Sequence, residues 1–127
     1  MSGYLLDTHV LLWLGNDTPL SDRGNALIDS GAALYFSVAS VWELVIKNAM
    51  GRVDFSIDVP AFRSHALDAG YLELNISAGH AVAVGSLPRI HRDPFDRLIV
   101  AQAQLEGVAI LTADPQVAAY DVTTIEA

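Results

Sequence analysis

Short apolar runs alternate with longer segments of helical periodicity along the chain. Residues 3–6 form an apolar run typical of a buried strand, and residues 8–14 continue from it as a helix that Gly15 and Asn16 end. The same pattern predicts three more strands and a final edge strand, at residues 33–36, 71–74, 108–111 and 122–125. The chain is therefore expected to fold from short strands with helices between them.

Residues that favour helix ends mark those helices. Ser37 is a good N-cap for a helix over residues 38–50, and Asp93-Pro94 begins another that runs to residue 106. Further helices are predicted at residues 21–31, 58–70, 77–86 and, as a short turn, from Asp114-Pro115 onward. This alternation predicts an α/β fold, with a parallel sheet between helices on both faces, in one domain spanning residues 1–127.

Several carboxylates fall where such a fold binds ligands, outside the carboxyl ends of its strands. Asp7 ends the first strand, Asp114 follows the last buried strand, and Asp93 and Asp96 start a helix that would reach the same edge. Anions gathered at one edge repel one another unless cations are held there. Mg²⁺ or Mn²⁺ suits oxygen ligands, and such a metal can activate water for phosphodiester cleavage.

Each acid also has a structural explanation. Asp7 could be a turn residue, Asp114 could cap the helix that starts at Pro115, and Asp93 is the best N-cap in the chain. Asp96 differs, because it shares a helical stripe with apolar residues, where a carboxylate is costly to bury without a cation. Capping is thus favoured for Asp93, and a functional site for Asp96.

Glu43 is ambiguous from the sequence alone. It shares a polar stripe with Ser40 and Lys47 on the predicted helix over residues 38–50. A Glu-to-Lys pair at this spacing is an ordinary exposed ion pair, and this is the favoured interpretation of Glu43 before any family is considered.

Histidines and basic residues carry weaker signals. His9 follows Asp7 by two residues and could approach the site, although a lone histidine is seldom a ligand. Two more histidines lie on predicted helices without an obvious acidic partner, His65 and His80. His91 lies in the basic segment 89–92, which Arg97 follows; this segment is either a solvated loop or a contact for RNA phosphates.

The amino-acid composition predicts an interface between subunits. The chain is 52% hydrophobic, yet it contains no uninterrupted apolar stretch long enough to span a membrane. The apolar surplus therefore predicts a homodimer, with residues 10–14 and 38–46 as candidate surfaces, and Trp13 and Trp42 are expected to pack in the core or at an interface. Cysteines are absent and no cation precedes Arg23, so a cytoplasmic protein without a signal peptide is expected.

The net charge of −8 argues against a broad basic surface for nucleic acid. The objection weakens if several carboxylates neutralise bound cations. A basic protein partner would also suit the acidic surface.

Four blocks of the sequence resemble, in the same order, those of PIN-domain proteins, and above all the VapC-type toxins of bacterial toxin–antitoxin pairs. The blocks are Leu-Leu-Asp-Thr-His, Ser-Val-Ala-Ser-Val-Trp-Glu-Leu-Val-Ile-Lys, Asp-Pro-Phe-Asp-Arg-Leu-Ile-Val-Ala-Gln-Ala and Leu-Thr-Ala-Asp. The resemblance implies a PIN-like α/β/α sandwich with an acidic active site. Matched block by block, the catalytic and metal-binding acids are Asp7, Glu43, Asp96 and Asp114. The same match gives possible supporting roles to Thr8, Thr112, Asp93 and Arg97.

The resemblance also implies an activity and partners. These are Mg²⁺- or Mn²⁺-dependent endonucleolytic cleavage of RNA, commonly transfer or ribosomal RNA, a homodimer, and silencing by a VapB-type antitoxin. The main alternative is an inactive PIN-like binding or regulatory module, against which the four retained acids argue. A haloacid-dehalogenase-like phosphotransferase would need an aspartate at His9, and a receiver domain would need a lysine at a strand end, whereas the only lysine is Lys47.

Overall fold

The computed structural model describes residues 2–51 and 56–127, and its centre is a five-stranded parallel sheet with the order β3-β2-β1-β4-β5. The strands are β1 (Tyr4–Leu6), β2 (Leu34–Ser37), β3 (Leu72–Leu74), β4 (Ala109–Thr112) and β5 (Thr124–Glu126). Leu5 of β1 is paired with Tyr35 on one side and Ile110 on the other. The predicted strands are thus all present, and the expected edge strand forms slightly later than residues 122–125.

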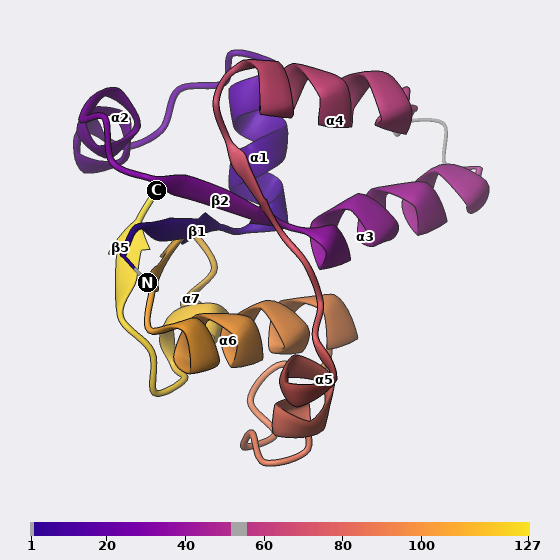
Figure 1. Ribbon diagram of the computed structural model, residues 1–127, viewed down its shortest axis with the longest axis vertical. Coiled ribbons are helices and arrows are strands. Elements are labelled where there is room, and N and C mark those ends of the chain that lie inside the picture. Colours follow the sequence, from indigo (N-terminus) through magenta and orange to yellow (C-terminus); the bar gives the residue numbers. More distant parts are fainter. Residues whose placement is uncertain (1, 52–55) are drawn as a thin grey trace.

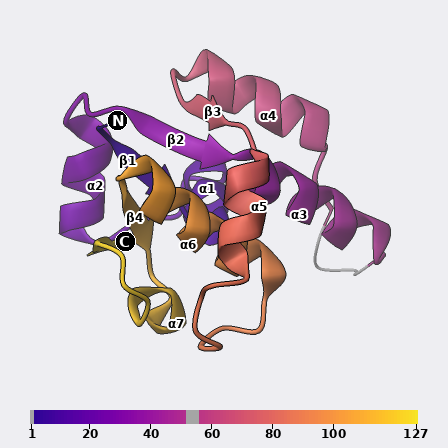
Figure 2. The same cartoon turned by 60° about the horizontal axis from the view of Figure 1, so that its bottom comes forward.

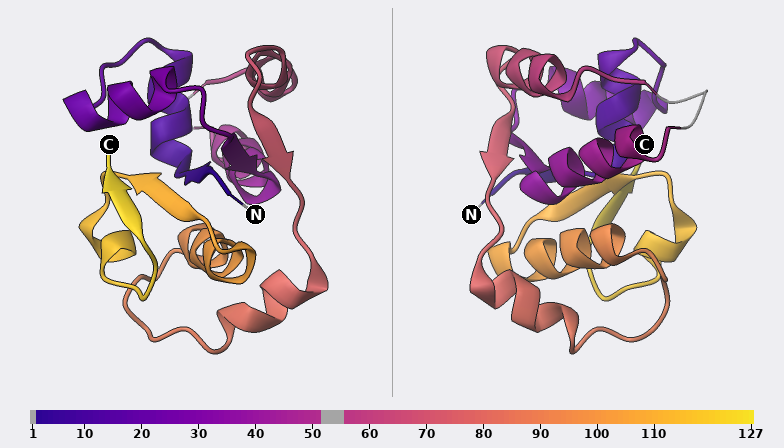
Figure 3. Two further views of the ribbon diagram at one scale, coloured as in Figure 1. Left: turned by 60° about the vertical axis from the view of Figure 1, so that its left-hand side comes forward. Right: turned by 90° about the vertical axis from the view of Figure 1, so that its right-hand side faces the viewer.

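Helices cover both faces of this sheet (Figures 1 and 3). They are α1 (Thr8–Gly15), α2 (Asp22–Asp29), α3 (Val38–Ala49), α4 (Val59–Asp68), α5 (Ala78–Val84), α6 (Pro94–Glu106) and α7 (Pro115–Ala118). One layer contains α1, α2 and α4, and the other contains α5, α6 and α7 (Figure 1). The predicted α/β/α sandwich with a central parallel sheet is therefore confirmed.

Consecutive strand residues supply the two layers of the core, because successive side chains in a strand point to opposite faces. Leu5 packs in the cluster that contains Ile99 and Val100 of α6, whereas Leu6 packs in the cluster that contains Val10 and Leu11 of α1. The burial of Val10 and Leu11 corrects one expectation. The start of the 10–14 segment belongs to the core and does not provide a dimer surface.

Helix starts follow the predicted caps. The side chains of Ser21, Ser37, Asp58, Ser77 and Asp93 each accept a hydrogen bond from a backbone N–H in the first turn of the helix that follows. Each such bond satisfies a donor that the helix itself leaves unpaired. In the part of the chain that the structure describes, no helix is both long and apolar enough to cross a membrane.

The strand order reverses between β1 and β4. The chain leaves β1 toward β2 and β3, then returns through α5 and α6 to place β4 on the other side of β1 (Figure 2). Ligands bind at such a reversal of strand order, at the carboxyl ends of the strands. Asp7 follows β1 at this edge, and Asp114 lies two residues beyond β4. The first turn of α6 reaches the same edge, since α6 runs back along the sheet before β4 begins.

Candidate active site

Asp7 occupies the centre of this edge and is buried, with 3% of its surface exposed. Its side chain does not cap α1, although Asp7 stands at the N-cap position, so the turn-residue interpretation does not account for it. One carboxylate oxygen, Oδ2, accepts a hydrogen bond of 2.6 Å from the hydroxyl of Thr112 at the end of β4. That hydroxyl in turn accepts a bond from the backbone N–H of Asp114. Thr112 therefore links the two strand ends and orients Asp7.

Asp96 lies in the first turn of α6 and is also buried. Burial raises its pKa to about 7, and the negative charges of Asp7, Asp93 and Glu43 add to the rise, which His91 partly offsets. Burial likewise raises the pKa of Asp7, and Asp114 adds to that rise, against the hydrogen bond from Thr112. These acids, far apart in sequence, thus lie close enough to disfavour one another's ionised forms.

Glu43 enters the site from α3, and here the exposed-pair interpretation is wrong. The predicted ion pair exists, with Lys47 Nζ 2.8 Å from Glu43 Oε2, but only 4% of the Glu43 side chain is exposed. The polar stripe of α3 faces inward, since Ser40 is buried and hydrogen-bonded to the Thr8 hydroxyl at 2.7 Å. Thr8 therefore joins the start of α1 to α3 beside the acids.

Asp114 acts as a cap and also reaches the site. Its Oδ1 accepts a hydrogen bond from the Gln116 N–H at the start of α7, as the capping interpretation expects. Its Oδ2 lies 2.9 Å from Nε2 of His91, whose same nitrogen lies 3.0 Å from Asp96 Oδ2. The sequence indicates His91 only as part of a basic segment and does not predict its position between these two acids. The one available signal was its place two residues before the Asp93 cap.

Three other expectations can be compared with the structure. Asp93 Oδ1 accepts bonds from the N–H groups of Phe95 and Asp96, so it caps α6 as predicted. Arg97 donates to the carbonyls of Pro88 and Val84, and the structure does not bring its guanidinium to the carboxylates. His80 does have an acidic partner, contrary to expectation: its Nε2 lies 2.9 Å from Glu106 Oε1 at the end of α6.

The donor set fits a hard divalent cation. All four acids offer carboxylate oxygens, the ligands that Mg²⁺ and Mn²⁺ prefer. Two buried oxygens, Asp7 Oδ1 and Glu43 Oε1, have no hydrogen-bond partner among the described residues. A buried, unpaired carboxylate oxygen is costly, and a bound cation would remove that cost.

An open pocket of about 250 Å³ gives access to two of these acids. Asp7 and Asp114 line it together with His9 and Trp13, whose ring centroids are 6.4 Å apart. His9 is exposed and its charge lowers the pKa of Asp7, which agrees with the expectation that it approaches the site. Substrate could therefore reach Asp7 and Asp114 from solvent without opening the fold.

Known structures share this architecture. The chain is similar over 98% of its length to a chain of VapBC2 from Rickettsia felis bound to a promoter DNA fragment, with 98% of that chain covered, a TM-score of 0.71 and 18% identity. A DNA-bound VapBC from Salmonella typhimurium matches with a TM-score of 0.68 and 16% identity, over 99% of this chain and 98% of that one. FitAcB from Neisseria gonorrhoeae matches with a TM-score of 0.66 and 20% identity, over 97% and 96%.

A comparison with curated protein sequences found no significant match. A comparison with protein families, however, matches residues 4–122 to the PIN domain. That segment includes every strand except β5 and all of the acids described above. The chain belongs to the PIN-domain family.

Proposed function

We propose that this protein is a metal-dependent endoribonuclease and the toxin of a type II toxin–antitoxin pair. The observation that carries the proposal is the convergence of buried acids from the end of β1, from α3 and from α6, two of which keep an unpaired buried oxygen. Membership of the PIN-domain family supports nuclease chemistry for such a cluster. A binding module would have no use for carboxylates that destabilise one another.

Asp7, Glu43, Asp96 and Asp114 would hold Mg²⁺ or Mn²⁺. When bound, the metal supplies an activated water and charge stabilisation for phosphodiester cleavage. The chain's own contribution is orientation: the Thr112 hydroxyl fixes Asp7, and Lys47 fixes one oxygen of Glu43. The raised pKa of Asp96 fits this role, because a cation would offset both the burial of its charge, which is the main cause of the rise, and the repulsion by the neighbouring acids.

The proposed substrate is RNA, with transfer or ribosomal RNA as the class that the family resemblance favours. Arg89 and Arg92 are exposed on the loop before α6, next to the acids in sequence, and could contact phosphates. Such local cations would compensate for the net charge of −8.

The proposed partners follow from the complexes that share the fold. The similar chains come from VapBC and FitAB assemblies, so a VapB-type antitoxin is the proposed inhibitor. A homodimer through the exposed side of α3 is the proposed oligomer, and the cytoplasm is the proposed location.

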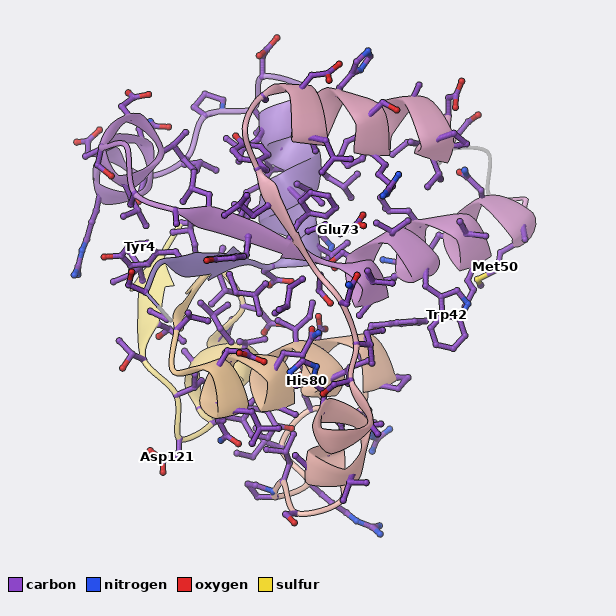
Figure 4. All side chains as sticks on the ribbon, viewed as in Figure 1. Tyr4, Trp42, Met50, Glu73, His80 and Asp121 are labelled. Atoms are coloured by element: carbon purple, nitrogen blue, oxygen red, sulfur yellow. The ribbon has the colours of Figure 1, made fainter. Side chains whose placement is uncertain are left out.

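The direct test is cleavage of total bacterial RNA by the purified chain with added Mn²⁺. Asp96→Asn and Glu43→Gln should each reduce cleavage to background and weaken Mn²⁺ binding, because a neutral amide cannot replace the charge. Asp121→Asn is the matched control, since it removes the same charge from an exposed position that projects away from the sheet (Figure 4). A wild-type chain that cleaves no RNA at saturating Mn²⁺ would support the inactive module instead.

The toxin role has its own test in cells. Inducible expression in bacteria should arrest growth, and co-expression of a small protein encoded immediately upstream should relieve the arrest. Asp96→Asn should abolish the arrest at equal expression. Harmless expression of the wild-type chain would contradict the toxin role, even if the purified chain cleaves RNA.

A further inference from the structure

His91 lies between two of the carboxylates. Its Nε2 is 2.9 Å from Asp114 Oδ2 and 3.0 Å from Asp96 Oδ2, and the three atoms all lie within 4.8 Å of one another. Two arrangements fit these distances. His91 could be a nitrogen ligand that shares a metal ion with both acids, or it could be a hydrogen-bond donor that holds the two carboxylates together.

The other ring nitrogen decides between them. Nδ1 of His91 accepts a hydrogen bond of 3.1 Å from the backbone N–H of Asp93. A backbone amide can only donate, so Nδ1 must present its lone pair, and the proton of the neutral imidazole then resides on Nε2. A nitrogen that bears a proton has no lone pair for a metal. Nε2 therefore bears the proton and donates it to Asp114, while Asp96 Oδ2 lies against the same N–H at 3.0 Å.

The main chain at His91 is held as firmly as the ring. Its backbone N–H donates to the hydroxyl of Tyr120 at 2.8 Å, and Tyr120 is buried after α7. Arg97 donates to the same hydroxyl and to the carbonyl of Pro88, which anchors the loop to α6. These contacts explain what Arg97 does in the structure: it supports the loop that carries His91.

We infer that His91 is a positioning residue: its Nε2–H donates to Asp114 and lies against Asp96, which holds these two acids in place for the cation, and Tyr120 in turn positions His91. The inference rests on the proposed metal site. Each carboxylate oxygen can accept more than one bond, so both acids remain available as ligands. Without the donor, two anions from different elements would face each other with nothing between them, and the site would lose its preorganised geometry.

Metal affinity tests the inference without RNA. His91→Leu should weaken Mn²⁺ binding, measured by electron paramagnetic resonance titration, roughly 10–100-fold, the usual cost of losing a partner that orients ligands. His91→Gln should restore most of the affinity, because its amide can still donate. Tyr120→Phe should weaken binding by a smaller factor, and Tyr71→Phe, half-buried between α4 and β3, should leave it unchanged. Binding to His91→Leu as tight as to the wild type would overturn the inference.

The imidazole itself gives a second readout that does not need a variant. Two-bond ¹H–¹⁵N correlations on the metal-free protein should show the His91 proton on Nε2, and the pattern should persist when Mg²⁺ is added. Loss of the Nε2 proton on Mg²⁺ addition would make His91 a ligand and refute the assignment. Both measurements are independent of RNA, so a chain that binds metal as described but cleaves nothing would contradict the proposed function and leave this inference standing.

Discussion

Asp93 and Asp96 are one turn apart at the start of α6, yet their carboxylates have different surroundings. Asp93 is half-buried, and its oxygen accepts two backbone N–H groups. Burial, and after it the charges of neighbouring acids, raise the pKa of Asp96 to about 7. The same chemical group therefore stabilises the helix at one position and destabilises the metal-free fold at the other.

The first prediction concerns the pH dependence that Asp96 causes in the metal-free protein. Its pKa is near 4 in the unfolded chain and about 7 in the fold, so the fold binds more protons between these values. The contribution of Asp96 to the free energy of unfolding should therefore fall as pH rises from about 4 to 7. Asp96→Asn should remove this fall and be more stable than the wild type at pH 8 by about 1–2 kcal/mol.

Urea denaturation with a chelator, at pH 5 and pH 8, measures this difference. The gap between Asp96→Asn and the wild type should narrow at pH 5, where Asp96 is protonated in the fold. A variant less stable than the wild type at pH 8 would mean that the carboxylate is stabilised by its surroundings and not repelled.

The second prediction separates the cap from the site. Asp93→Asn should retain most RNA cleavage and most stability, because an amide oxygen caps about as well as a carboxylate. Asp93→Ala should lose about 1 kcal/mol of unfolding free energy, since two N–H groups lose their acceptor. Melting curves and the cleavage assay on each variant test this. An Asp93→Asn variant that is fully folded but as inactive as Asp96→Asn would place Asp93 among the catalytic acids.

At the scale of elements, the order and type of strands and helices follow from local signals. Apolar runs predicted the strands, and Ser, Asp, Pro and Gly at the helix ends predicted the helices. Both kinds of signal act within a few residues, so they can be recognised from the sequence alone. What could not be predicted is which side of a helix meets the rest of the protein. The polar stripe of α3 looked exposed, but Ser40 and Glu43 are buried and Trp42 and Val45 are exposed.

The same limit applies to the site. Asp7 and Asp114 could be assigned to one edge from their strands, since the carboxyl ends of parallel strands share an edge. The position of His91 could not be predicted in this way, because its partner Asp114 is 23 residues away and only the folded loop brings the two side chains together. Glu43 was recognised through its sequence block, and its burial depends on α3 packing against α6, which no local pattern indicates.

The third prediction concerns how α6 ends. Gly107 follows α6 in the left-handed region, with φ +68°, and a side chain there would meet no atom within 4 Å. Gly107→Ala should thus destabilise the fold by roughly 1 kcal/mol through backbone strain alone. Gly79→Ala, in the first turn of α5, should instead stabilise by about 0.5 kcal/mol, because the backbone there is helical. Equal effects of the two substitutions in chemical denaturation would contradict this account.

At the scale of the whole molecule, the two sides of α3 have different roles: the polar side is buried and the apolar side is exposed. The buried side contributes Glu43 to the acids, and the exposed side leaves apolar surface in solvent. Trp42 is 55% exposed, Val45 48% and Met50 66%. In the view of Figure 4, Trp42 and Met50 extend from the same side of α3. Exposed apolar side chains close together on one helix are typical of a subunit interface.

The fourth prediction is therefore a homodimer that buries this side of α3. Trp42 and Val45 are three residues apart and so adjacent on the helix surface, and Trp42 also packs edge-on against Phe95 at the start of α6, with ring centroids 5.2 Å apart. An interface there would shield Trp42 without altering the fold. Val45→Glu should dissociate the dimer, because each protomer would place a charge in an apolar contact, while the melting temperature of the protomer should change little since Val45 is exposed.

Light scattering at tens of micromolar, without an antitoxin, measures the mass of each variant. Val82→Glu is the matched control: the same substitution at a side chain 78% exposed on α5, away from α3, should leave the dimer intact. Metal affinity gives a second readout, because Glu43 lies on the opposite side of α3 from Val45. Pairing of two α3 helices would restrain α3 and with it the carboxylate of Glu43. Mn²⁺ affinity should accordingly fall in Val45→Glu and not in Val82→Glu. A wild-type chain that is monomeric under these conditions, or a Val82→Glu variant that dissociates as readily, would contradict the α3 interface.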